Sequence, residues 1–432
     1  MVRLELDSLN SYVNSARRVA DARLKGFRGP MEVAAAAEDL NAYPGLETLS
    51  APRTVRVLEE EEGDLDAEGR AAVLAGRVFW EHAAAGEATR LSLGPKFFLT
   101  PDFLLKEYQR AGLGPALPRR ELLPLELGRR HLKQLVYEIR ELALEAGEDP
   151  QKVLNRQKTL FIASAEAMEA VQKQVLQDLY GLWPLPNIWF MTQASFYGLN
   201  KRGEKWDYDP VSPKRLHNHG AMLMQKAMDG QIYRFNAAGE LQRLSREEHL
   251  GELAAFDNLV SYNIEDLDYL TRALDFAALG LAARAKDEGY GFLMEVLSNN
   301  PERPIKGGCC AFDPALKRDV MIESFRLKGY RPEDIKFLNK NINHNLGPAQ
   351  IYPILQEKGL FMPVSVKDGF LYFQPVQGDL NFILPTAFFR RQKMRPINCL
   401  KALGDIPAAL EAMEAQDLQP GFPRFAESPA RG

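Results

Sequence analysis

Two cationic side chains follow a stretch of small residues early in the chain. An apolar run, Val78–Trp80, has the residue types of a strand, and it breaks into the small residues Ala83–Gly86. Residues this small let backbone N–H groups approach a ligand closely. Arg90 and Lys96 come next. An arginine can bind phosphate oxygens bidentately and a lysine supplies a movable charge, which suits a phosphoryl group that gains charge during transfer. The pattern predicts a phosphate-binding loop, or alternatively a plain turn.

A second candidate lies where an expected strand ends. The segment Asn187–Met191, N-I-W-F-M, is typical of a short buried strand, and Thr192 and Gln193 follow it. Open α/β sheets bind ligands at the carboxyl ends of their strands. Gln193 has the donors and acceptors to read the edge of a base, although the two polar residues could equally cap the next turn.

Two histidines precede an expected helix that starts near Ala221. The sequence L-H-N-H-G-A places His217 and His219 around Asn218, with Gly220 after them. Such a pair could bind a metal or an anion. Because no third ligand lies nearby in the sequence, hydrogen bonding or helix capping is favoured over zinc binding.

Carboxylates follow the expected strand Leu259–Tyr262. Glu265, Asp266 and Asp268 come directly after it, beyond Asn263. Mg²⁺ commonly binds one or two carboxylates together with substrate phosphates, so these residues are candidate metal ligands. The alternative is a capped helix that begins at Asp266.

Further polar residues are spread over the last third of the chain. Gly307 and Gly308 allow backbone to meet a ligand, and Glu323 ends the expected strand D-V-M-I-E-S. Amides suit sugar hydroxyls, and four alternate along one segment that could also be an ordinary loop: Asn339, Asn341, Asn343 and Asn345.

The elements that must position these residues follow from hydrophobic periodicity. Helical spacing is expected over Leu9–Leu40, Ala67–Ala75, Thr100–Gly147 and Ala163–Leu179. Residues 1–66 are expected to form a helical region with an acidic linker, residues 67–400 an α/β domain, and residues 401–432 a short tail. A helical lid or side domain is expected as an insertion at about 100–150. The strand, helix, strand order predicts parallel strands.

Composition restricts the class of protein. The 432 residues are 46% hydrophobic and 26% charged, with a formal net charge of -4, which does not favour a general nucleic-acid binder. The three cysteines have neither disulfide nor zinc spacing, so a reducing cytoplasm is expected. No run of about 20 apolar residues indicates a membrane span.

The order of these motifs resembles the UDP-sugar pyrophosphorylases over roughly residues 70–400. Residues 85–92, A-G-E-A-T-R-L-S, followed by Pro95 and Lys96, are similar to the family's Gly-Gly-x-Gly-Thr-Arg-Leu-Gly loop and its Pro-Lys. Q-K-T-L-F-I-A-S resembles the segment that opens the family's next helix. N-H-G-A, N-I-E-D-L, I-K-G-G, I-E-S, L-N-K-N and R-Q-K-M-R-P-I-N resemble later family motifs in the family's order.

The resemblance implies a Rossmann-like (GT-A-like) mixed sheet flanked by helices and a role for each matching residue. Arg90 and Lys96 would be catalytic, and Glu265 would hold Mg²⁺. The nucleotide would contact Ala85, Gly86, Glu87, Met191, Gln193, His219 and Gly220. The sugar would contact Gly308, Glu323, Asn339 and Asn341.

The implied activity is nucleotidyl transfer. A nucleoside triphosphate, UTP by this resemblance, and a sugar 1-phosphate would give a nucleotide sugar and pyrophosphate, with Mg²⁺ as cofactor. The sugar phosphate needs no general base, since it is already a competent nucleophile at neutral pH.

Departures from the family pattern leave two other functions open. Ala88 and Ser92 replace glycines of the loop, Glu87 adds a negative charge there, and Asn398 stands at the family's late phosphate-binding lysine. These changes favour a non-catalytic relative that binds a nucleotide or nucleotide sugar. Asp-Leu-Asp at 266–268 also keeps a glycosyltransferase metal motif open.

Overall fold

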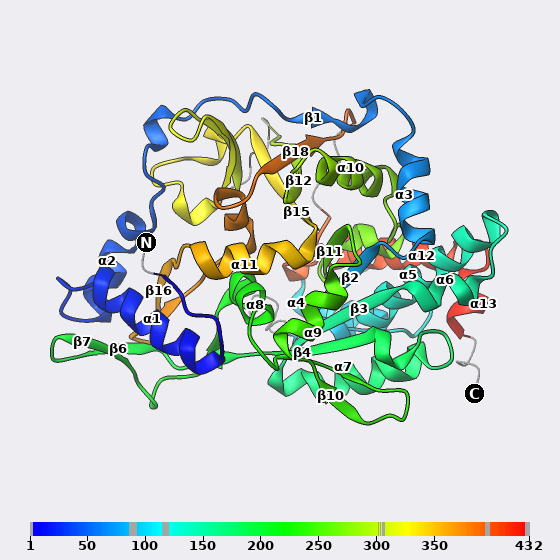
Figure 1. Cartoon of the computed structure of the whole chain (residues 1–432), viewed down its shortest axis with the longest axis horizontal. Helices are drawn as coiled ribbons and strands as arrows, with labels where there is room; N and C mark the ends of the chain where they lie inside the picture. Colours follow the sequence, from blue (N-terminus) through cyan, green and yellow to red (C-terminus); the bar gives the residue numbers. More distant parts are fainter. Residues whose placement is uncertain are drawn as a thin grey trace.

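The computed structural model describes residues 3–85, 93–114, 121–300, 302, 304, 307–393 and 398–427. Its α-helices, with the labels used in Figure 1, are α1 (Leu9–Arg23), α2 (Pro30–Asn41), α3 (Leu65–Leu74), α4 (Pro101–Ala111), α5 (Leu127–Glu145), α6 (Pro150–Arg156), α7 (Ala165–Leu179), α8 (Asn218–Lys226), α9 (Arg246–Leu253), α10 (Phe276–Asp287), α11 (Pro348–Lys358), α12 (Ile406–Asp417) and α13 (Phe422–Glu427).

The strands form one large mixed sheet and two small sheets. The large sheet has the order β1-β18-β12-β15-β11-β2-β3-β4-β9-β10, with β13 and β14 attached at β15. A second sheet has the order β16-β17-β6-β7, and β5 pairs with β8. The bounds are β1 (Arg56–Val57), β2 (Val78–Ala85), β3 (Lys158–Ser164), β4 (Ile188–Gln193), β5 (Ser195–Phe196), β6 (Leu199–Arg202), β7 (Lys205–Tyr208), β8 (Arg215–Leu216), β9 (Ile232–Phe235), β10 (Leu241–Arg243), β11 (Asn258–Asn263), β12 (Phe292–Ser298), β13 (Cys309–Asp313), β14 (Arg318–Ile322), β15 (Phe337–Leu346), β16 (Val364–Lys367), β17 (Phe370–Phe373) and β18 (Thr386–Arg390).

Strand directions confirm the expected mixed α/β fold. β11, β2, β3 and β4 run parallel to one another, whereas β15 is antiparallel to both β11 and β12. The four parallel strands end at one edge of the sheet, which is the edge that binds ligands in open α/β folds.

The central strands are largely buried and mostly apolar because both faces of the large sheet are covered. Trp80 of β2 and Phe190 of β4 belong to a core shared with α5, α7 and α12. Phe79 and Trp189, their neighbours in sequence, belong to a second core shared with α1, α8 and α11. Alternate side chains of a strand point to opposite faces, so the molecule has three layers (Figure 1).

Several expected elements differ from the structure. Leu9–Leu40 is two helices, α1 and α2, because Gly29 and Pro30 interrupt it. β2 continues to Ala85 through the small residues expected in a loop. The segment K-T-L-F-I-A-S was expected to open a helix but is the buried strand β3, and α7 starts only at Ala165.

The row of asparagines and the pair of histidines also lie in regular elements. Asn339 to Asn345 alternate along the strand β15 and are not in a loop. α8 begins at Asn218, so His219 and Gly220 lie inside its first turn and not ahead of it.

The helices at about 100–150 are part of the layer that covers the sheet. α5 buries twelve residues, and the guanidinium of Arg130, which is fully buried, forms an ion pair of 2.7 Å with Asp417 of α12. The expected insertion and the expected C-terminal tail therefore pack against each other. The domain boundaries stay predictions.

None of the helices within the described parts of the chain combines the length and apolar character that a membrane span requires.

Candidate functional site

A cavity of about 360 Å³ opens at the carboxyl ends of the parallel strands. One wall carries Ala83 of β2, Ile162 of β3, Gln193 of β4 and Asn263 of β11. The other wall comes from β8, α8 and the second sheet. The complete described lining is Ala83, Lys96, Ile162, Gln193, Arg215, Leu216, Asn218, His219, Met222, Asn263, Ile264, Glu265, Lys367 and Gln374.

Lys96 and Glu265 come from different motifs and are in direct contact in this pocket. Lys96 lies at the start of a short 3₁₀ helix, Lys96–Phe98, and its Nζ is 2.6 Å from Oε2 of Glu265. The other carboxylate oxygen, Oε1, is 3.5 Å from Nζ of Lys401. Glu265 therefore holds two ammonium groups at the edge of the pocket.

Backbone pairing explains why Lys401 reaches Glu265. The backbone N–H of Leu267 donates to the carbonyl of Asn398, and the N–H of Leu400 donates to the carbonyl of Glu265. This antiparallel register turns the Asn398 side chain to Asp268, with Nδ2 to Oδ1 at 3.3 Å. Lys401 is the next residue after the paired segment.

The two aspartates near Glu265 are engaged elsewhere. Asp266 is buried and accepts from the backbone N–H of Asp268, which caps the 3₁₀ helix Leu267–Leu270. Burial, and then the charge of Asp268, raises the pKa of Asp266 to about 7. Asp268 itself forms an ion pair with Lys340. The capped helix expected as an alternative is thus present as a 3₁₀ turn.

Gln193 and His219 lie on facing elements of the pocket. Gln193 is buried at the end of β4, and its Nε2 is 3.5 Å from the carbonyl of Asn218. Nδ1 of His219 accepts from the backbone N–H of Gln377 at 2.8 Å, so the proton of the neutral ring is on Nε2. Desolvation lowers the pKa of His219 to about 4, while Glu265 opposes this shift.

Gly220 has a packing role beside these residues. Its N–H donates to the carbonyl of Pro375 at 3.0 Å. A Cβ on Gly220 would lie 2.4 Å from the carbonyl carbon of Pro375, so only glycine allows α8 to approach this segment. Gly220 is not among the described residues that line the pocket. Its close packing positions the turn that carries His219.

The residues predicted to bind sugar form a second cluster. A Cβ on Gly308 would lie 3.2 Å from Cβ of Asn339 and 3.5 Å from Oε2 of Glu323, so these three residues are neighbours. Asn339 donates a hydrogen bond to Glu323. Burial and then the charge of Asp379 raise the pKa of Glu323 to about 7, against the lowering effects of Asn339, Arg326 and Lys401.

A short 3₁₀ segment, Gln377–Phe382, joins this cluster to the pocket. Its first residue donates to His219, and a Cβ on Gly378 would lie 2.8 Å from Oε1 of Glu323. Lys401 acts electrostatically on Glu323 and contacts Glu265. The nucleotide and sugar candidates are therefore adjacent parts of one site.

Not every predicted residue is placed at the pocket. Met191 is fully buried in the apolar core and does not line the cavity. Gly86, Glu87 and Arg90 lie outside the described residues, as do the side chains of Ala85 and Asn341. The phosphate loop stays a prediction.

Four polar residues at the site were missed from the sequence. Arg215 is in β8, Lys367 ends β16, Gln374 follows β17 and Lys401 lies beyond the last strand. No motif marks the first three: Lys367 and Gln374 come from the second sheet and its neighbouring segment, and Arg215 comes from the pair β5-β8. One feature of the sequence could have pointed to Lys401: it is a lysine three residues after Asn398, which stands at the family's late phosphate-binding lysine.

The magnesium site expected at Glu265 has a poor donor set. Within the described ranges no three His, Cys, Asp or Glu side chains gather as metal ligands. One carboxylate can suffice when substrate phosphates complete the shell. Here, however, each oxygen of Glu265 already faces an ammonium group. Magnesium binding stays a prediction.

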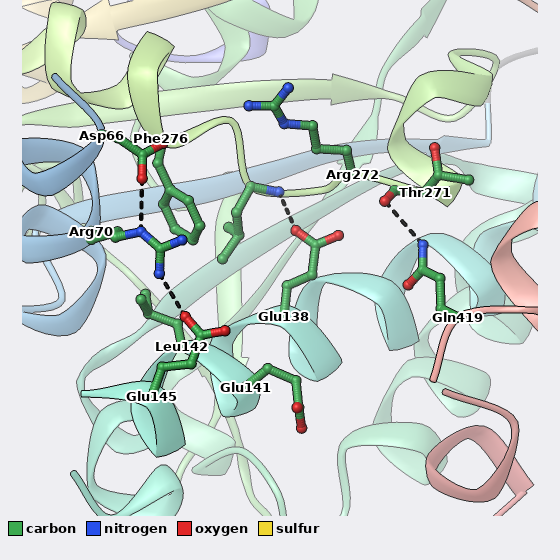
Figure 2. A pocket seen from close by; sticks show the side chains of 11 residues that line it. Asp66, Arg70, Glu138, Glu141, Leu142, Glu145, Thr271, Arg272, Phe276 and Gln419 are labelled. Atoms are coloured by element: carbon green, nitrogen blue, oxygen red, sulfur yellow. Dashed lines mark hydrogen bonds and ion pairs between the residues drawn. The ribbon is translucent and has the colours of Figure 1, made fainter. Parts of the chain in front are cut away.

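A second cavity of about 360 Å³ lies between α3, α5 and the segment before α10 (Figure 2). Nε of Arg70 is 2.8 Å from Asp66, its Nη1 is 2.7 Å from Glu145, and Glu138 accepts from the N–H of Leu274. The described lining of this second cavity has more acidic than basic side chains, whereas that of the first pocket has more basic than acidic ones.

Comparison with known proteins was made by sequence and by structure. No family model matches the chain, and neither does any curated protein sequence. Solved structures do match. UDP-N-acetylglucosamine pyrophosphorylase from Trypanosoma brucei, solved with an inhibitor, has a TM-score of 0.59 and 14% identity, covering 91% of this chain and 79% of that one.

Two structures of UDP-glucose pyrophosphorylase from Leishmania major are also similar. The enzyme in open and closed forms has a TM-score of 0.56 and 14% identity, covering 92% of this chain and 74% of that one. Its G45Y mutant in complex with UDP-glucose has a TM-score of 0.54 and 14% identity, covering 91% and 74%. The resemblance expected from the motifs is confirmed at the level of architecture: the chain has the fold of the UDP-sugar pyrophosphorylases.

Proposed function

We propose that the protein is a nucleotidyltransferase that makes a nucleotide sugar, a UDP-sugar, and pyrophosphate from UTP and a sugar 1-phosphate. The observation that carries the proposal is the contact of 2.6 Å between Lys96 and Glu265 at the strand ends. The two residues were assigned from motifs 169 positions apart, and Gln193 and His219, from two further motifs, line the same pocket.

The charge of the pocket supports anionic substrates. Lys96, Arg215 and Lys367 line it, while Glu265 is the one acidic side chain in its described lining. The chain as a whole is acidic, with a formal net charge of -4, so this local excess of cations is not a general property of the surface. Phosphates would gain from such a pocket by charge-assisted hydrogen bonds.

The proposed reaction is an in-line displacement. An oxygen of the sugar 1-phosphate attacks the α-phosphorus of UTP, the new O–P bond forms, and the bond to pyrophosphate breaks. Lys96 neutralises phosphate charge, and Gln193 offers hydrogen bonds to the base. Glu323 and Asn339 offer acceptors and a donor to sugar hydroxyls. The protein mainly positions two anions.

Purified protein with UTP and a panel of sugar 1-phosphates tests this proposal. We expect pyrophosphate release with at least one sugar, measured by a coupled assay with and without Mg²⁺. Release with none of them, under either condition, would contradict enzymatic transfer.

The second candidate is a relative that binds a UDP-sugar without turning it over. Glu87, Ala88 and Ser92 favour it, because they alter the charge and backbone freedom of the loop. Calorimetry together with the pyrophosphate assay separates the two functions. Heat of UDP-glucose binding, with no turnover in the forward or the reverse direction, supports the binding protein.

A further inference from the structure

Glu265 is surrounded by cations of the protein. Lys96 Nζ lies 2.6 Å from Oε2, and Lys401 Nζ lies 3.5 Å from Oε1. The side chains of Lys96 and Glu265 are 11% and 19% exposed, so this contact is shielded from water, whereas Lys401 is 38% exposed. Screening by solvent is therefore weaker for the first pair than for an ordinary surface ion pair.

A divalent cation on Glu265 would have to share the carboxylate with these lysines. Mg²⁺ binds an oxygen at about 2.1 Å, which would bring it close to both ammonium groups. Repulsion between the dication and two positive charges would oppose this arrangement.

Other carboxylates in the neighbouring segment do not offset that cost. Asp266 accepts from the backbone N–H of Asp268, and Asp268 is paired with Lys340 and Asn398. Of the residues that the structure places around the pocket, Glu265 alone offers a carboxylate.

The same lysines lie where a metal ion would otherwise neutralise the phosphate charge of a ligand. They approach Glu265 from two elements, the 3₁₀ helix after β2 and the segment after Asn398, and Lys401 also acts on Glu323 of the sugar cluster. A phosphate at the junction of pocket and cluster would therefore meet cations from both elements.

We infer that Lys96 and Lys401, held by Glu265, neutralise the ligand's phosphates, so that a UDP-sugar binds this protein without a divalent cation. The inference rests on the proposed function, because it assumes that the pocket takes a UDP-sugar. It assigns Lys401 to phosphate binding and makes Glu265 a positioning residue that orients two lysines.

Calorimetry of UDP-glucose binding to the full chain tests this inference, once in EDTA and once in excess Mg²⁺. We expect the two dissociation constants to agree within about threefold. Binding that appears only with Mg²⁺, or that Mg²⁺ tightens by more than about tenfold, would overturn the inference while leaving the proposed function intact. Absence of UDP-glucose binding under both conditions, together with no pyrophosphate release from any sugar 1-phosphate of the panel, would overturn both.

Three variants sharpen the result. Lys401→Met is expected to weaken binding in EDTA by about ten- to a hundredfold, since it removes a charged contact to phosphate. Lys152→Met, at an exposed position of α6, is the matched control and should bind like the wild type.

Glu265→Gln distinguishes a positioning residue from a metal ligand. We expect its affinity to remain independent of Mg²⁺, as in the wild type. A metal ligand would behave otherwise: Mg²⁺ would tighten binding to the wild type, and the substitution would abolish that gain. Thermal unfolding of each variant checks that the loss of affinity is not a loss of fold.

Discussion

At the scale of single residues, Lys96 is the most deeply buried cation in the described lining of the pocket. Lys96 is nine-tenths buried, contacts Glu265 and lines the cavity. A buried lysine with one partner carboxylate remains able to turn to an incoming phosphate, because its four-carbon stem is flexible.

Lys96→Met should therefore remove most of the catalytic activity. We expect kcat for pyrophosphate release to fall by about 10²–10³, the usual effect of losing one electrostatic contact to the transition state. Steady-state kinetics measure this, with Lys152→Met as the control. A Lys96→Met protein with wild-type kcat would exclude the residue from the chemistry.

Glu323 gives a second prediction at the same scale, in the dependence of stability on pH. Its pKa of about 7 in the folded protein is above its ordinary value of 4.5. Between these values the folded state binds more protons than the unfolded state, so the free energy of unfolding falls as pH rises. Glu323→Gln stays neutral and lacks this loss.

Urea unfolding at pH 5 and pH 8 measures the effect. From pH 5 to pH 8, the free energy of unfolding of the wild type should fall relative to that of Glu323→Gln by about 1–2 kcal/mol. This is less than the full pKa shift would give, because the side chain is partly accessible to solvent. Glu333→Gln, at an exposed position, should show no such gain. Parallel pH curves for wild type and Glu323→Gln would refute the raised pKa.

Site residues were predictable where a motif ends a strand of the large sheet. Lys96, Gln193, His219 and Glu265 lie in the pocket as the motif order indicated. Arg215 and Lys367 were not predictable, because no motif marks them and two small sheets, β5-β8 and β16-β17-β6-β7, bring them there. Gly220 lets two backbone segments approach and is not in the described lining, and its expected contact with the nucleotide stays a prediction.

At the scale of elements, the turn that begins α8 is a point of tight backbone packing. Gly220 meets Pro375 and Val376 so closely that an added Cβ would be 2.4 Å from backbone. Gly220→Ala should destabilise the protein by about 1–3 kcal/mol. It should also weaken UDP-glucose binding, since His219 and Gln377 would move apart.

Gly251→Ala is the matched control for that substitution. Gly251 is a helical glycine of α9 with no atom within 4 Å of an added Cβ. Alanine should stabilise the helix there by about 0.5–1 kcal/mol. Thermal unfolding compares the two variants, and equal effects from both would contradict the packing argument.

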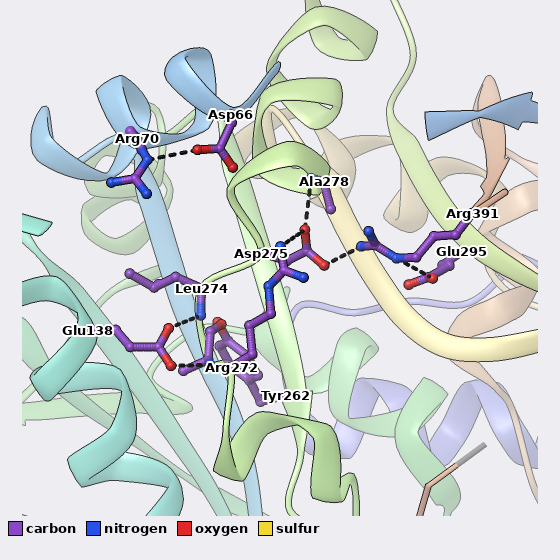
Figure 3. Close-up of polar contacts among 11 residues, drawn as sticks. Asp66, Arg70, Glu138, Tyr262, Arg272, Leu274, Asp275, Ala278, Glu295 and Arg391 are labelled. Carbon is purple, nitrogen blue, oxygen red and sulfur yellow. Dashed lines mark hydrogen bonds and ion pairs between the residues drawn. The ribbon is translucent and has the colours of Figure 1, made fainter. Parts of the chain in front are cut away.

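Arg391 joins the end of β18 to two other elements (Figure 3). Its Nη2 contacts Asp275, which caps α10, and its Nε is 3.1 Å from Oε1 of Glu295 in β12. Glu295 is fully buried, so removing the guanidinium takes a close positive charge away from a carboxylate in the core. Arg391→Met should lower the free energy of unfolding by about 3–5 kcal/mol.

Arg390→Met, one residue earlier and only partly buried, serves as the control for this network. It should change the free energy of unfolding by about 0.5 kcal/mol or less, as substitutions outside such networks do. Urea unfolding of both variants measures these changes in the free energy of unfolding. A small effect for Arg391→Met would show that the network is not needed for stability.

At the scale of elements, residue types indicated the strand β4 but not β3, although both faces of each strand are buried. β4 and β11 lie close to their expected bounds, whereas β3 lies where the start of a helix was expected. K-T-L-F-I-A-S has no polar alternation, since it lies between two covered faces, and α7 follows it with no intervening turn. The segment that forms β15 could not be assigned from its sequence, because a segment rich in asparagine is also typical of a loop.

At the scale of the whole molecule, the fold brings motifs spread over some 300 residues to one edge of the sheet. β2 and β11 are far apart in sequence but are neighbouring parallel strands, so the segments after them, with Lys96 and Glu265, must meet. The antiparallel β15 then places Asn339 beside Glu323. This topology could be expected only through the family resemblance, because local periodicity does not encode strand order.

The central claim is that this pocket and the adjacent cluster together bind a UDP-sugar. A crystal of the protein soaked with UDP-glucose tests it most directly. We predict density for the diphosphate within hydrogen-bond distance of Lys96, the base beside Gln193, and the glucose ring against Glu323 and Asn339. Density in the cavity of Figure 2 alone, or none at the strand ends in a crystal that retains this pocket, would contradict the claim.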